Sequence, residues 1–260
     1  MLRDRLIFSL IYNDGAFMQS RNFRLQRVGD INWLERNYKF QKISFSLDEL
    51  VVLNASRKDK NIEEFSQVVK RLVDDVFIPV AAGGGIRSLE DADLLFLNGA
   101  DKVILNTPLY KRPGLIKEIT GKYGTQSVVA CIDYKNINGI TEVYINDGSE
   151  LIDIALVDYI DYVQKLGVGE IILNSIDKDG TGFGYDFDTI NNVSQQMSVP
   201  LILMGGAGNE LHLQEGLELD FVSAVATANL FNFIGNGLPK AREYLLASGA
   251  NIAFWSKAEQ

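Results

Sequence analysis

The sequence predicts a (β/α)8 barrel, an α/β fold in which eight parallel strands alternate with helices. Short apolar runs rich in valine, isoleucine and leucine recur along the 260 residues, and amphipathic stretches separate several of them. The runs do not alternate between polar and apolar residues, which is typical of parallel strands buried on both faces. Because barrels of about 200–250 residues fold as one unit, we expect residues 1–260 to form a single domain.

The expected elements follow in order along the chain. Strands are expected at Arg5–Ile11, Glu49–Asn54, Ile78–Ala82, Lys102–Asn106, Ser127–Ile132, Glu170–Asn174, Pro200–Met204 and Phe221–Ala226. Helices are expected at Asn61–Asp75, Leu89–Asn98, Pro113–Tyr123, Asp153–Leu166 and Asp188–Met197. The alternative is an open doubly wound sheet, but such sheets usually carry a nucleotide-binding fingerprint after the first strand, and the sequence has none there.

The chain also contains an internal repeat with a period of about 120 residues. Three segments recur in the same order: Ile11-Tyr-Asn matches Asp133-Tyr-Lys-Asn, Glu49-Leu-Val-Val-Leu-Asn matches Glu170-Ile-Ile-Leu-Asn, and Ala82-Gly-Gly-Gly-Ile matches Met204-Gly-Gly-Ala-Gly. The nearly constant offset indicates two duplicated half-barrels, at roughly residues 1–122 and 123–260. No low-complexity linker separates the halves, so we expect them to close into one barrel.

Composition argues against several classes of function. The formal net charge is −9, which is unfavourable for contact with nucleic acids or with anionic membrane surfaces. Cys131 is the single cysteine and His212 the single histidine. An intrachain disulfide is therefore impossible, and zinc enzymes and Ser-His or Cys-His hydrolases are disfavoured. We expect a cytoplasmic protein without metal or other cofactor.

Glycine-rich turns follow the strands in both halves. Active sites of such barrels lie at the carboxyl ends of the strands, where turns of this kind expose backbone N–H groups that can hold phosphate. The first half offers Gly84, Gly85, Asn106 and Thr107, and the second offers Asp179, Gly180, Gly206, Ala228 and Asn229. The two sets predict a ligand with two separated phosphates; alternatively, the glycines only permit tight turns.

Asp133 is the candidate catalytic residue. It ends the apolar strand Val128-Val-Ala-Cys-Ile-Asp, and a carboxylate at a barrel mouth can act as a general acid or base. The alternative is a carboxylate that only orders a neighbouring loop. Asp177 and Asp179 could likewise serve a site or a turn, since Asp-Gly favours turns.

The whole chain resembles the cyclase subunit of imidazole glycerol phosphate synthase. The resemblance is carried by Met1-Leu-Arg, Asp14-Gly15, Asn22-Phe23, Gly83-Gly-Gly-Ile86, Gly99-Ala-Asp-Lys-Val, Asn106-Thr107, Ser175-Ile-Asp-Lys-Asp-Gly-Thr181, Gly184-Tyr185-Asp186 and Gly205-Gly-Ala-Gly208. It implies a duplicated (β/α)8 barrel, a bisphosphorylated substrate, and ammonia supplied by a glutaminase subunit docked on the bottom of the barrel.

The sequence departs from the family pattern at the predicted site. The family has catalytic aspartates at the ends of strands one and five; Asp133 matches the second, but the first is Ile11, which cannot transfer a proton. The strand-two aspartate corresponds to Asn54, and the lysine of the first mobile loop to Gln19. A serine pair of the second phosphate site is replaced by Met204 and Asn229. The resemblance thus implies that the first phosphate site is kept and the second altered.

Another set of family residues is kept. The family gates its ammonia channel with four charges at the barrel bottom, and the matching residues are Arg5, Glu49, Lys102 and Glu170, each at the start of an expected strand. A barrel interior is normally packed shut, so a polar ring there would have a reason to exist if something passes through it. The alternative is four separately solvated charges at strand starts.

The chain lacks one of the family's catalytic residues but keeps the channel residues. In this pattern it resembles the paralogues that work in nucleotide-sugar amidation. The first hypothesis is an ammonia-channelling barrel subunit of a glutamine amidotransferase complex, which serves acetamido-to-acetamidino sugar modification for surface polysaccharide. Its partners would be a glutaminase, in a heterodimer, and a sugar amidotransferase. The second hypothesis is a true cyclase subunit of histidine biosynthesis. The third is a non-catalytic scaffold that activates a glutaminase.

Overall fold

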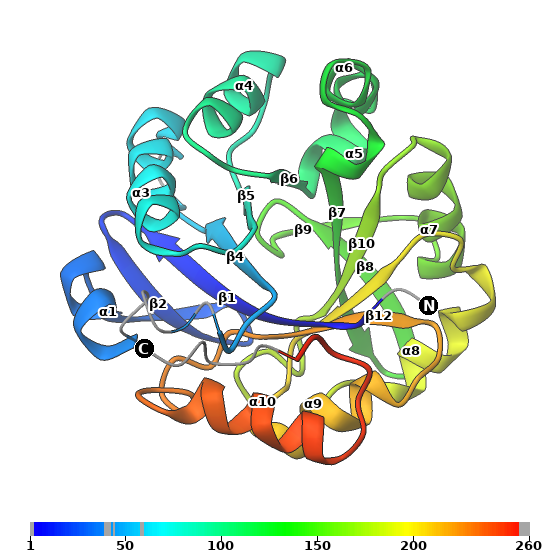
Figure 1. The fold of residues 1–260 in the computed structure, drawn as a ribbon. Helices are drawn as coiled ribbons and strands as arrows, with labels where there is room; N and C mark the ends of the chain where they lie inside the picture. Colours follow the sequence, from blue (N-terminus) through cyan, green and yellow to red (C-terminus); the bar gives the residue numbers. More distant parts are fainter. Residues whose placement is uncertain (1–2, 39–42, 44, 58–59, 255–260) are drawn as a thin grey trace.

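Eight parallel strands close into a barrel with helices around it, which confirms the predicted fold (Figure 1). The computed structural model describes residues 3–38, 43, 45–57 and 60–254, so Met1 and Leu2 of the first family motif lie outside it. Around the barrel the strands are β1 (Arg5–Asn13), β4 (Glu49–Asn54), β5 (Val80–Gly83), β6 (Lys102–Leu105), β7 (Val128–Ile137), β10 (Glu170–Ser175), β11 (Leu201–Met204) and β12 (Val222–Thr227). The ring closes because β1 pairs with β12 and β7 with β10.

All eight expected strands are present, with small differences at their ends. The strands expected from Ile78 and Pro200 begin two residues and one residue later, at Val80 and Leu201. Pro79 and Pro200 precede these starts, and proline has no N–H to donate to a neighbouring strand. The ladders therefore begin just after each proline.

β1 and β7 continue beyond the barrel into antiparallel hairpins that the sequence analysis did not predict. β1 pairs with β2 (Ala16–Arg21) and β2 with β3 (Arg24–Gly29). In the second half, β7 pairs with β8 (Ile140–Ile145) and β8 with β9 (Glu150–Ile152). The first turns are Asp14-Gly15 and Asn138-Gly139, in which all four residues have positive φ, as two-residue hairpin loops require. The hairpins thus occupy matching positions in the two predicted halves.

Helices lie outside the strands and return the chain to the bottom of the barrel. They are α1 (Ile31–Tyr38), α3 (Ile62–Asp75), α4 (Leu89–Leu97), α5 (Thr107–Lys111), α6 (Gly114–Tyr123), α7 (Leu156–Lys165), α8 (Phe187–Val193), α9 (Glu210–Leu217) and α10 (Gly237–Ala247), with short 3-10 turns at Thr125–Ser127 and Ser194–Gln196. The expected helices are present, although the one expected to reach Met197 ends at Val193. None of the described helices is long and apolar enough to cross a bilayer.

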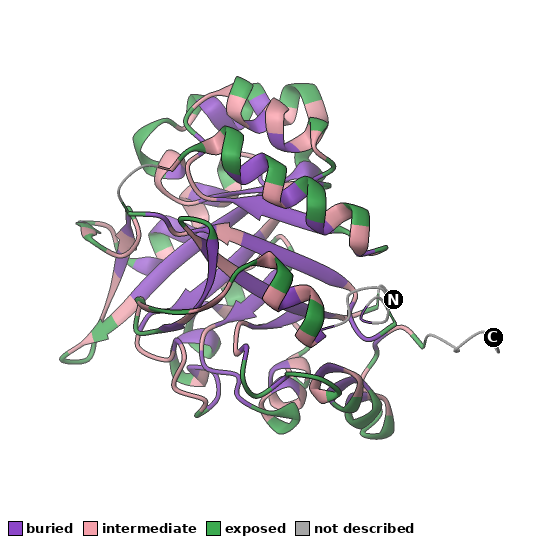
Figure 2. Cartoon of the chain, turned by 90° about the vertical axis from the view of Figure 1, so that its left-hand side faces the viewer, coloured by how far each residue is buried: buried purple, intermediate pink, exposed green. Residues whose placement is uncertain are grey.

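Two separate apolar clusters hold the barrel together. The larger cluster lies between the strands and the helices, and includes Phe8, Leu50 and Ile160. A smaller cluster fills the barrel interior, with Ile7, Val51 and Ile172 among its members and alanines at several other positions. Figure 2 shows the consequence, because the strands are coloured as buried along most of their length while the helices expose their outer faces.

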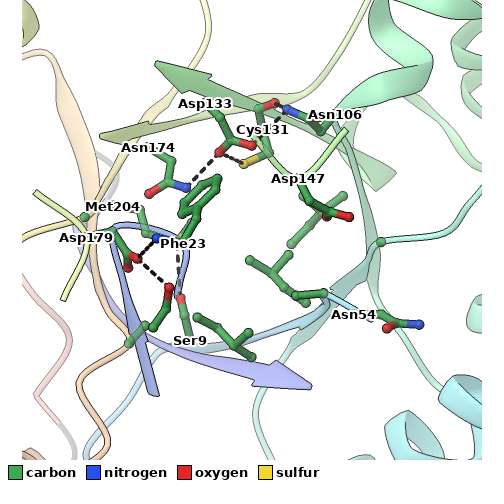
Figure 3. Close-up of a pocket in the computed structure, with 18 of the residues that line it drawn as sticks. Ser9, Phe23, Asn54, Asn106, Cys131, Asp133, Asp147, Asn174, Asp179 and Met204 are labelled. Atoms are coloured by element: carbon green, nitrogen blue, oxygen red, sulfur yellow. Dashed lines mark hydrogen bonds between the residues drawn. The ribbon is translucent and has the colours of Figure 1, made fainter. Parts of the chain in front are cut away.

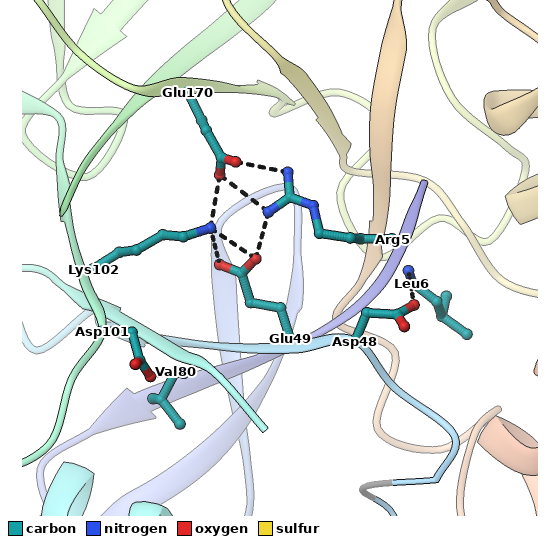
Figure 4. Close-up of polar contacts among 8 residues, drawn as sticks. All are labelled: Arg5, Leu6, Asp48, Glu49, Val80, Asp101, Lys102 and Glu170. Atoms are coloured by element: carbon teal, nitrogen blue, oxygen red, sulfur yellow. Dashed lines mark hydrogen bonds and ion pairs between the residues drawn. The ribbon is translucent and has the colours of Figure 1, made fainter. Parts of the chain in front are cut away.

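A buried ion pair fastens the last helix to the barrel bottom. Asp48, just before β4, accepts two hydrogen bonds of 3.0 Å from the guanidinium of Arg242 in α10, and both side chains are almost fully buried. Asp48 also accepts a hydrogen bond of 2.8 Å from the backbone N–H of Leu6 (Figure 4). One carboxylate therefore links α10, β1 and β4.

Replacing this carboxylate is expected to destabilise the fold strongly. Asp48→Ala leaves the Arg242 guanidinium buried without its carboxylate, which should lower the free energy of unfolding by about 3–5 kcal/mol. Urea unfolding would measure the loss. The control is Glu35→Ala, whose pair with Arg71 is largely exposed and should contribute less than about 1 kcal/mol. Equal losses for the two variants would contradict the role given to Asp48.

Candidate functional site

The carboxyl ends of the barrel strands surround a pocket of about 510 Å³. Figure 3 looks into it: residues from both predicted halves surround a common space, with Asp133 and Asn174 on one side and Asn54 on another. Every residue predicted for the catalytic and phosphate sites lines this pocket. The fold therefore brings the two separated sets of sequence candidates into one cavity.

Asp133 lies in the wall of this pocket and is only 6% exposed. Its Oδ1 accepts a hydrogen bond of 2.7 Å from Asn174 Nδ2 and one of 3.6 Å from Cys131 Sγ. Its Oδ2 accepts one of 3.2 Å from Asn106 Nδ2. The carboxylate is thus fixed by three neighbours, which lie on β7, on β10 and just after β6.

Burial raises the pKa of Asp133 to about 7, far above that of an ordinary aspartate. The hydrogen bonds from Asn174 and Cys131 lower the pKa, and the charges of Asp147 and Asp179 raise it further. Burial also raises the pKa of the Cys131 thiol, which therefore stays protonated and able to donate. A carboxyl group half ionised near neutral pH can both accept and release a proton, as general acid–base catalysis requires.

The residue that the internal repeat pairs with Asp133 cannot take part in such chemistry. Ile11 lies near the end of β1 and lines the pocket with Leu53 and Met204. Beneath them, Ser9 Oγ donates a hydrogen bond of 3.6 Å to Met204 Sδ. This side of the pocket floor is therefore mainly apolar.

The first-half phosphate candidates lie at the ends of β5 and β6. Gly84 has a φ of 95°, and a Cβ there would lie 2.2 Å from the Asn54 carbonyl oxygen, so the turn requires glycine. Asn106 is directed toward Asp133 rather than into an anion site. Among the residues that the structure describes, the backbone N–H groups of Gly85 and Thr107 have no protein acceptor. These two groups remain free to bind an anion.

Cationic side chains surround the first-half candidates, and the sequence analysis missed them. They are Arg57, Lys60, Arg87, Lys111 and Arg112, all in segments that follow β4, β5 and β6. Three are ion-paired: Lys60 with Asp147 at 2.6 Å, Lys111 with Glu150 at 2.5 Å, and Arg112 with Glu118 at 3.3 Å. Their position just after strand ends is the signal that could have revealed them.

The second-half candidates have a different environment. Gly206 and Ala228 line the pocket, but Asn229 uses its side chain locally, because its Oδ1 accepts hydrogen bonds of 3.2 Å and 3.0 Å from the N–H groups of Phe231 and Asn232. The N–H of Leu230, in the same loop, donates a hydrogen bond of 2.9 Å to Gln19 Oε1. The N–H groups of residues 230–232 in the loop after β12 are therefore bonded within the chain.

Asp179 and Gly180 hold the first hairpin in place. Asp179 Oδ2 accepts hydrogen bonds of 2.5 Å from Ser20 Oγ and 3.0 Å from the Phe23 N–H. Burial raises the pKa of Asp179, and these two bonds counteract that effect. A Cβ on Gly180 would lie 2.0 Å from the Ser20 carbonyl oxygen. Both residues line the pocket, but they contact the β2–β3 turn.

Comparison with known proteins identifies the family of this barrel. The family model described as "Histidine biosynthesis protein" matches residues 17–234. Imidazole glycerol phosphate synthase subunits of Chlorobium luteolum and Chlorobaculum tepidum are each 37% identical to the chain over 253 residues, covering 97% of it and 99% of the relative. The chain belongs to the imidazole glycerol phosphate synthase cyclase subunit family. A further relative, from Parasynechococcus marenigrum strain WH8102, is provisionally assigned as subunit hisF2 of this synthase and is 46% identical over 98% of the chain and 95% of the relative.

The four charges expected from the cyclase family meet in one ring at the opposite end of the barrel (Figure 4). Arg5 lies 2.6 Å from a Glu49 oxygen and 2.8 Å from a Glu170 oxygen. Lys102 Nζ lies 3.0 Å from an oxygen of each of the same two carboxylates. Glu49 is only 2% exposed. Each cation thus bridges both acids, which is not the arrangement of four separately solvated charges.

The raised pKa of Asp133 predicts a specific pH dependence of stability. The folded chain holds this proton up to about pH 7, whereas the unfolded chain releases it near pH 4. Unfolding therefore releases a proton in between, and the stability that this proton contributes is lost as pH rises through this window. Asp133→Asn abolishes the ionisation, so its stability relative to the wild-type chain should rise by up to about 4 kcal/mol from pH 4 to pH 8.

Urea unfolding of both chains across this range would measure the difference. Asp153→Asn provides a control, because Asp153 is an exposed aspartate that lies outside the pocket. A stability difference between Asp133→Asn and the wild-type chain that stays constant with pH would contradict the raised pKa.

Proposed function

We propose that this chain is the ammonia-channelling barrel subunit of a glutamine amidotransferase complex, and that the complex converts an acetamido sugar to an acetamidino sugar. In this proposal a glutaminase docks at the strand amino ends and a sugar amidotransferase uses the ammonia. The observation that carries the proposal is that the four-charge ring is intact in a barrel where Ile11 stands at the position of the family's strand-one aspartate.

The position of the ring supports the direction of transfer. The ring lies at the amino ends of β1, β4, β6 and β10, and Asp133 lies near the end of the part of β7 that pairs with β10 in the barrel. The interior between them contains small side chains, including Ala81, Ala224 and Ala226. Ammonia entering at the ring would emerge beside Asp133, which can exchange a proton near neutral pH.

Exposed apolar residues support a docked subunit at the same end. Phe77 lies in the segment that leads into β5, and Leu97 is the last residue of α4 before β6. They are 81% and 82% exposed. Because the helices return the chain to the strand amino ends, both side chains lie at the end of the barrel that carries the ring. Large exposed apolar side chains are typical of surfaces that another protein covers.

The alternative of a true cyclase is less well supported. The cyclase reaction would have to proceed without the family's strand-one aspartate, because Ile11 stands there. The loss of one acid–base group typically lowers a reaction rate by a factor of about 10²–10⁴. Gln19, which replaces the mobile-loop lysine, is bound to the Leu230 N–H instead of being available to a substrate. A pure scaffold is disfavoured by the preserved pocket and by the proton affinity of Asp133.

Removing one charge of the ring should uncouple glutamine hydrolysis from the use of the ammonia that it releases. Lys102→Ala leaves Glu49 and Glu170 with Arg5 as their one remaining partner in the ring. Glutamine hydrolysis by the partner should continue while ammonia escapes to solvent. With the assembled complex and an acetamido nucleotide sugar as acceptor, product formed from glutamine should fall at least about tenfold more than product formed from ammonium chloride.

Lys122→Ala is the matched control, since its pair with Asp93 is exposed on the outer surface. It should leave both nitrogen sources equally effective. An equal loss for both sources in Lys102→Ala would assign the ring to stability alone, and no loss for either would remove it from the proposed pathway.

The residue at position 11 predicts the outcome of a genetic test. Expression of this chain in a bacterium that lacks its own cyclase subunit should not restore growth without histidine, because Ile11 cannot exchange a proton. Ile11→Asp alone should also fail, since Gln19 and Asn229 still occupy the donors of the loop after β12. Full growth with the wild-type chain would favour the cyclase alternative.

A further inference from the structure

A second cavity, of about 610 Å³, lies between the β2–β3 hairpin and the loop after β12. We call it the hairpin groove. Gln19, Gly180 and Asn229 line both this groove and the pocket around Asp133. The groove therefore borders the mouth of the pocket, at the end of the barrel opposite the four-charge ring.

The hairpin groove carries two positive charges that the chain does not compensate. Arg21 and Arg24 line it, are exposed, and stand directly opposite each other in the β2–β3 ladder. Like charges in this position destabilise a pair of strands. Among the described residues, none that lines the groove is acidic, and no carboxylate forms an ion pair with either arginine. In a chain of net charge −9, this groove is thus suited to an acidic partner.

The tip that presents the two arginines is held in place by backbone contacts. The N–H of Asn22 donates a hydrogen bond of 2.9 Å to the Asp179 carbonyl oxygen. Its Nδ2 donates bonds of 3.1 Å and 2.9 Å to the carbonyl oxygens of Ile176 and Asp177. A partner that binds the arginines would therefore not have to order the strand ends that carry them, which lowers the entropy cost of association.

Exposed aromatic side chains lie beside the arginines. Phe231 lines the groove and is 51% exposed, and Phe183, in the loop after β10, is 80% exposed. Their loops meet at Gly208, because Asn232 Nδ2 donates a hydrogen bond of 2.7 Å to its carbonyl oxygen and a Cβ there would lie 2.6 Å from Gly182 Cα. Arginine and aromatic residues are the types enriched where one protein binds another.

We propose that the hairpin groove, together with Phe183 and Phe231, is the docking surface for the subunit that consumes the ammonia, and that this subunit presents acidic side chains to Arg21 and Arg24. The assignment of that subunit as a sugar amidotransferase rests on the proposed function. A protein seated here would lie next to the pocket mouth and could receive ammonia without its passage through bulk solvent. A second copy of this chain is a poorer occupant, since a two-fold contact through the groove would bring the arginines of both copies together.

Charge reversal in the groove should weaken binding of the amidotransferase. Biolayer interferometry would measure its affinity for the assembled heterodimer of this chain and the glutaminase. Arg21→Glu/Arg24→Glu should raise the Kd at least about tenfold, because acidic side chains would then meet like charge. The wild-type affinity should fall as sodium chloride is added, and the double variant should lose most of this salt dependence.

Arg27→Glu/Lys117→Glu is the matched control, since it changes the net charge by the same amount at two exposed positions outside the groove. It should bind like the wild-type chain. If the glutamate variant does not fold, Arg21→Ala/Arg24→Ala removes the same charges and should give a smaller loss of affinity in the same direction.

An activity measurement links docking to transfer. With an acetamido nucleotide sugar as acceptor, Arg21→Glu/Arg24→Glu should lower product formed from glutamine at least about tenfold more than product formed from ammonium chloride. Unlike Lys102→Ala, which alters the ring at the other end of the barrel, it should do so by releasing the amidotransferase. Lys102→Ala should therefore leave the affinity for the amidotransferase unchanged.

The outcomes separate this inference from the proposed function. A wild-type complex that makes product from glutamine, with equal affinity for the amidotransferase in wild-type chain and folded double variant, would overturn the docking surface alone. No product from glutamine with the wild-type complex would contradict the proposed function itself. A nucleotide sugar that binds the isolated chain through these arginines, or a dimer of the chain that the double variant abolishes, would assign the groove to another occupant and overturn the inference.

Discussion

Closure of the barrel between β7 and β10 is the constraint on which the other features depend. Once these strands pair in parallel, with Asn174 beside Asp133, all eight carboxyl ends face the same way. Residues far apart in sequence then share one pocket, and the four strand-start charges meet at the opposite end. The pocket around Asp133 at one end and the ion-paired ring at the other are thus two consequences of one topology.

Much of this arrangement could be predicted from sequence, because it follows from pattern. The buried strands are apolar without alternation, and the repeat places Ile11 and Asp133, Glu49 and Glu170, and the two glycine turns at equivalent strand ends. The hairpins were missed even though Asp14-Gly15 and Asn138-Gly139 are strong turn signals. The strands that follow these turns are short and carry no long apolar run, so the apolar pattern does not indicate them.

What sequence could not reveal was the choice of hydrogen-bond partner. Asn106 is a plausible phosphate ligand by position, yet its amide is committed to Asp133. Asp179 is committed to the Ser20 hydroxyl, and Gln19 to a loop that follows the last barrel strand. These hydrogen-bond partners lie 27, 159 and 211 positions apart in the sequence, and the choice among them depends on fractions of an ångström that residue type does not encode.

The β2–β3 hairpin has a consequence for the timing of events in the pocket. Its tip lies against the turn before β9, where a Cβ on Gly148 would be 2.7 Å from the Phe23 ring. It is also bound to Asp179, and Arg57 donates to the Phe23 carbonyl oxygen. Phe23 lines the pocket, so where the release of a ligand requires the hairpin to move, these contacts must open together. Residence time would then be set by the opening rate of a hairpin, so a weakly held ligand could still stay long enough for a second reactant to arrive.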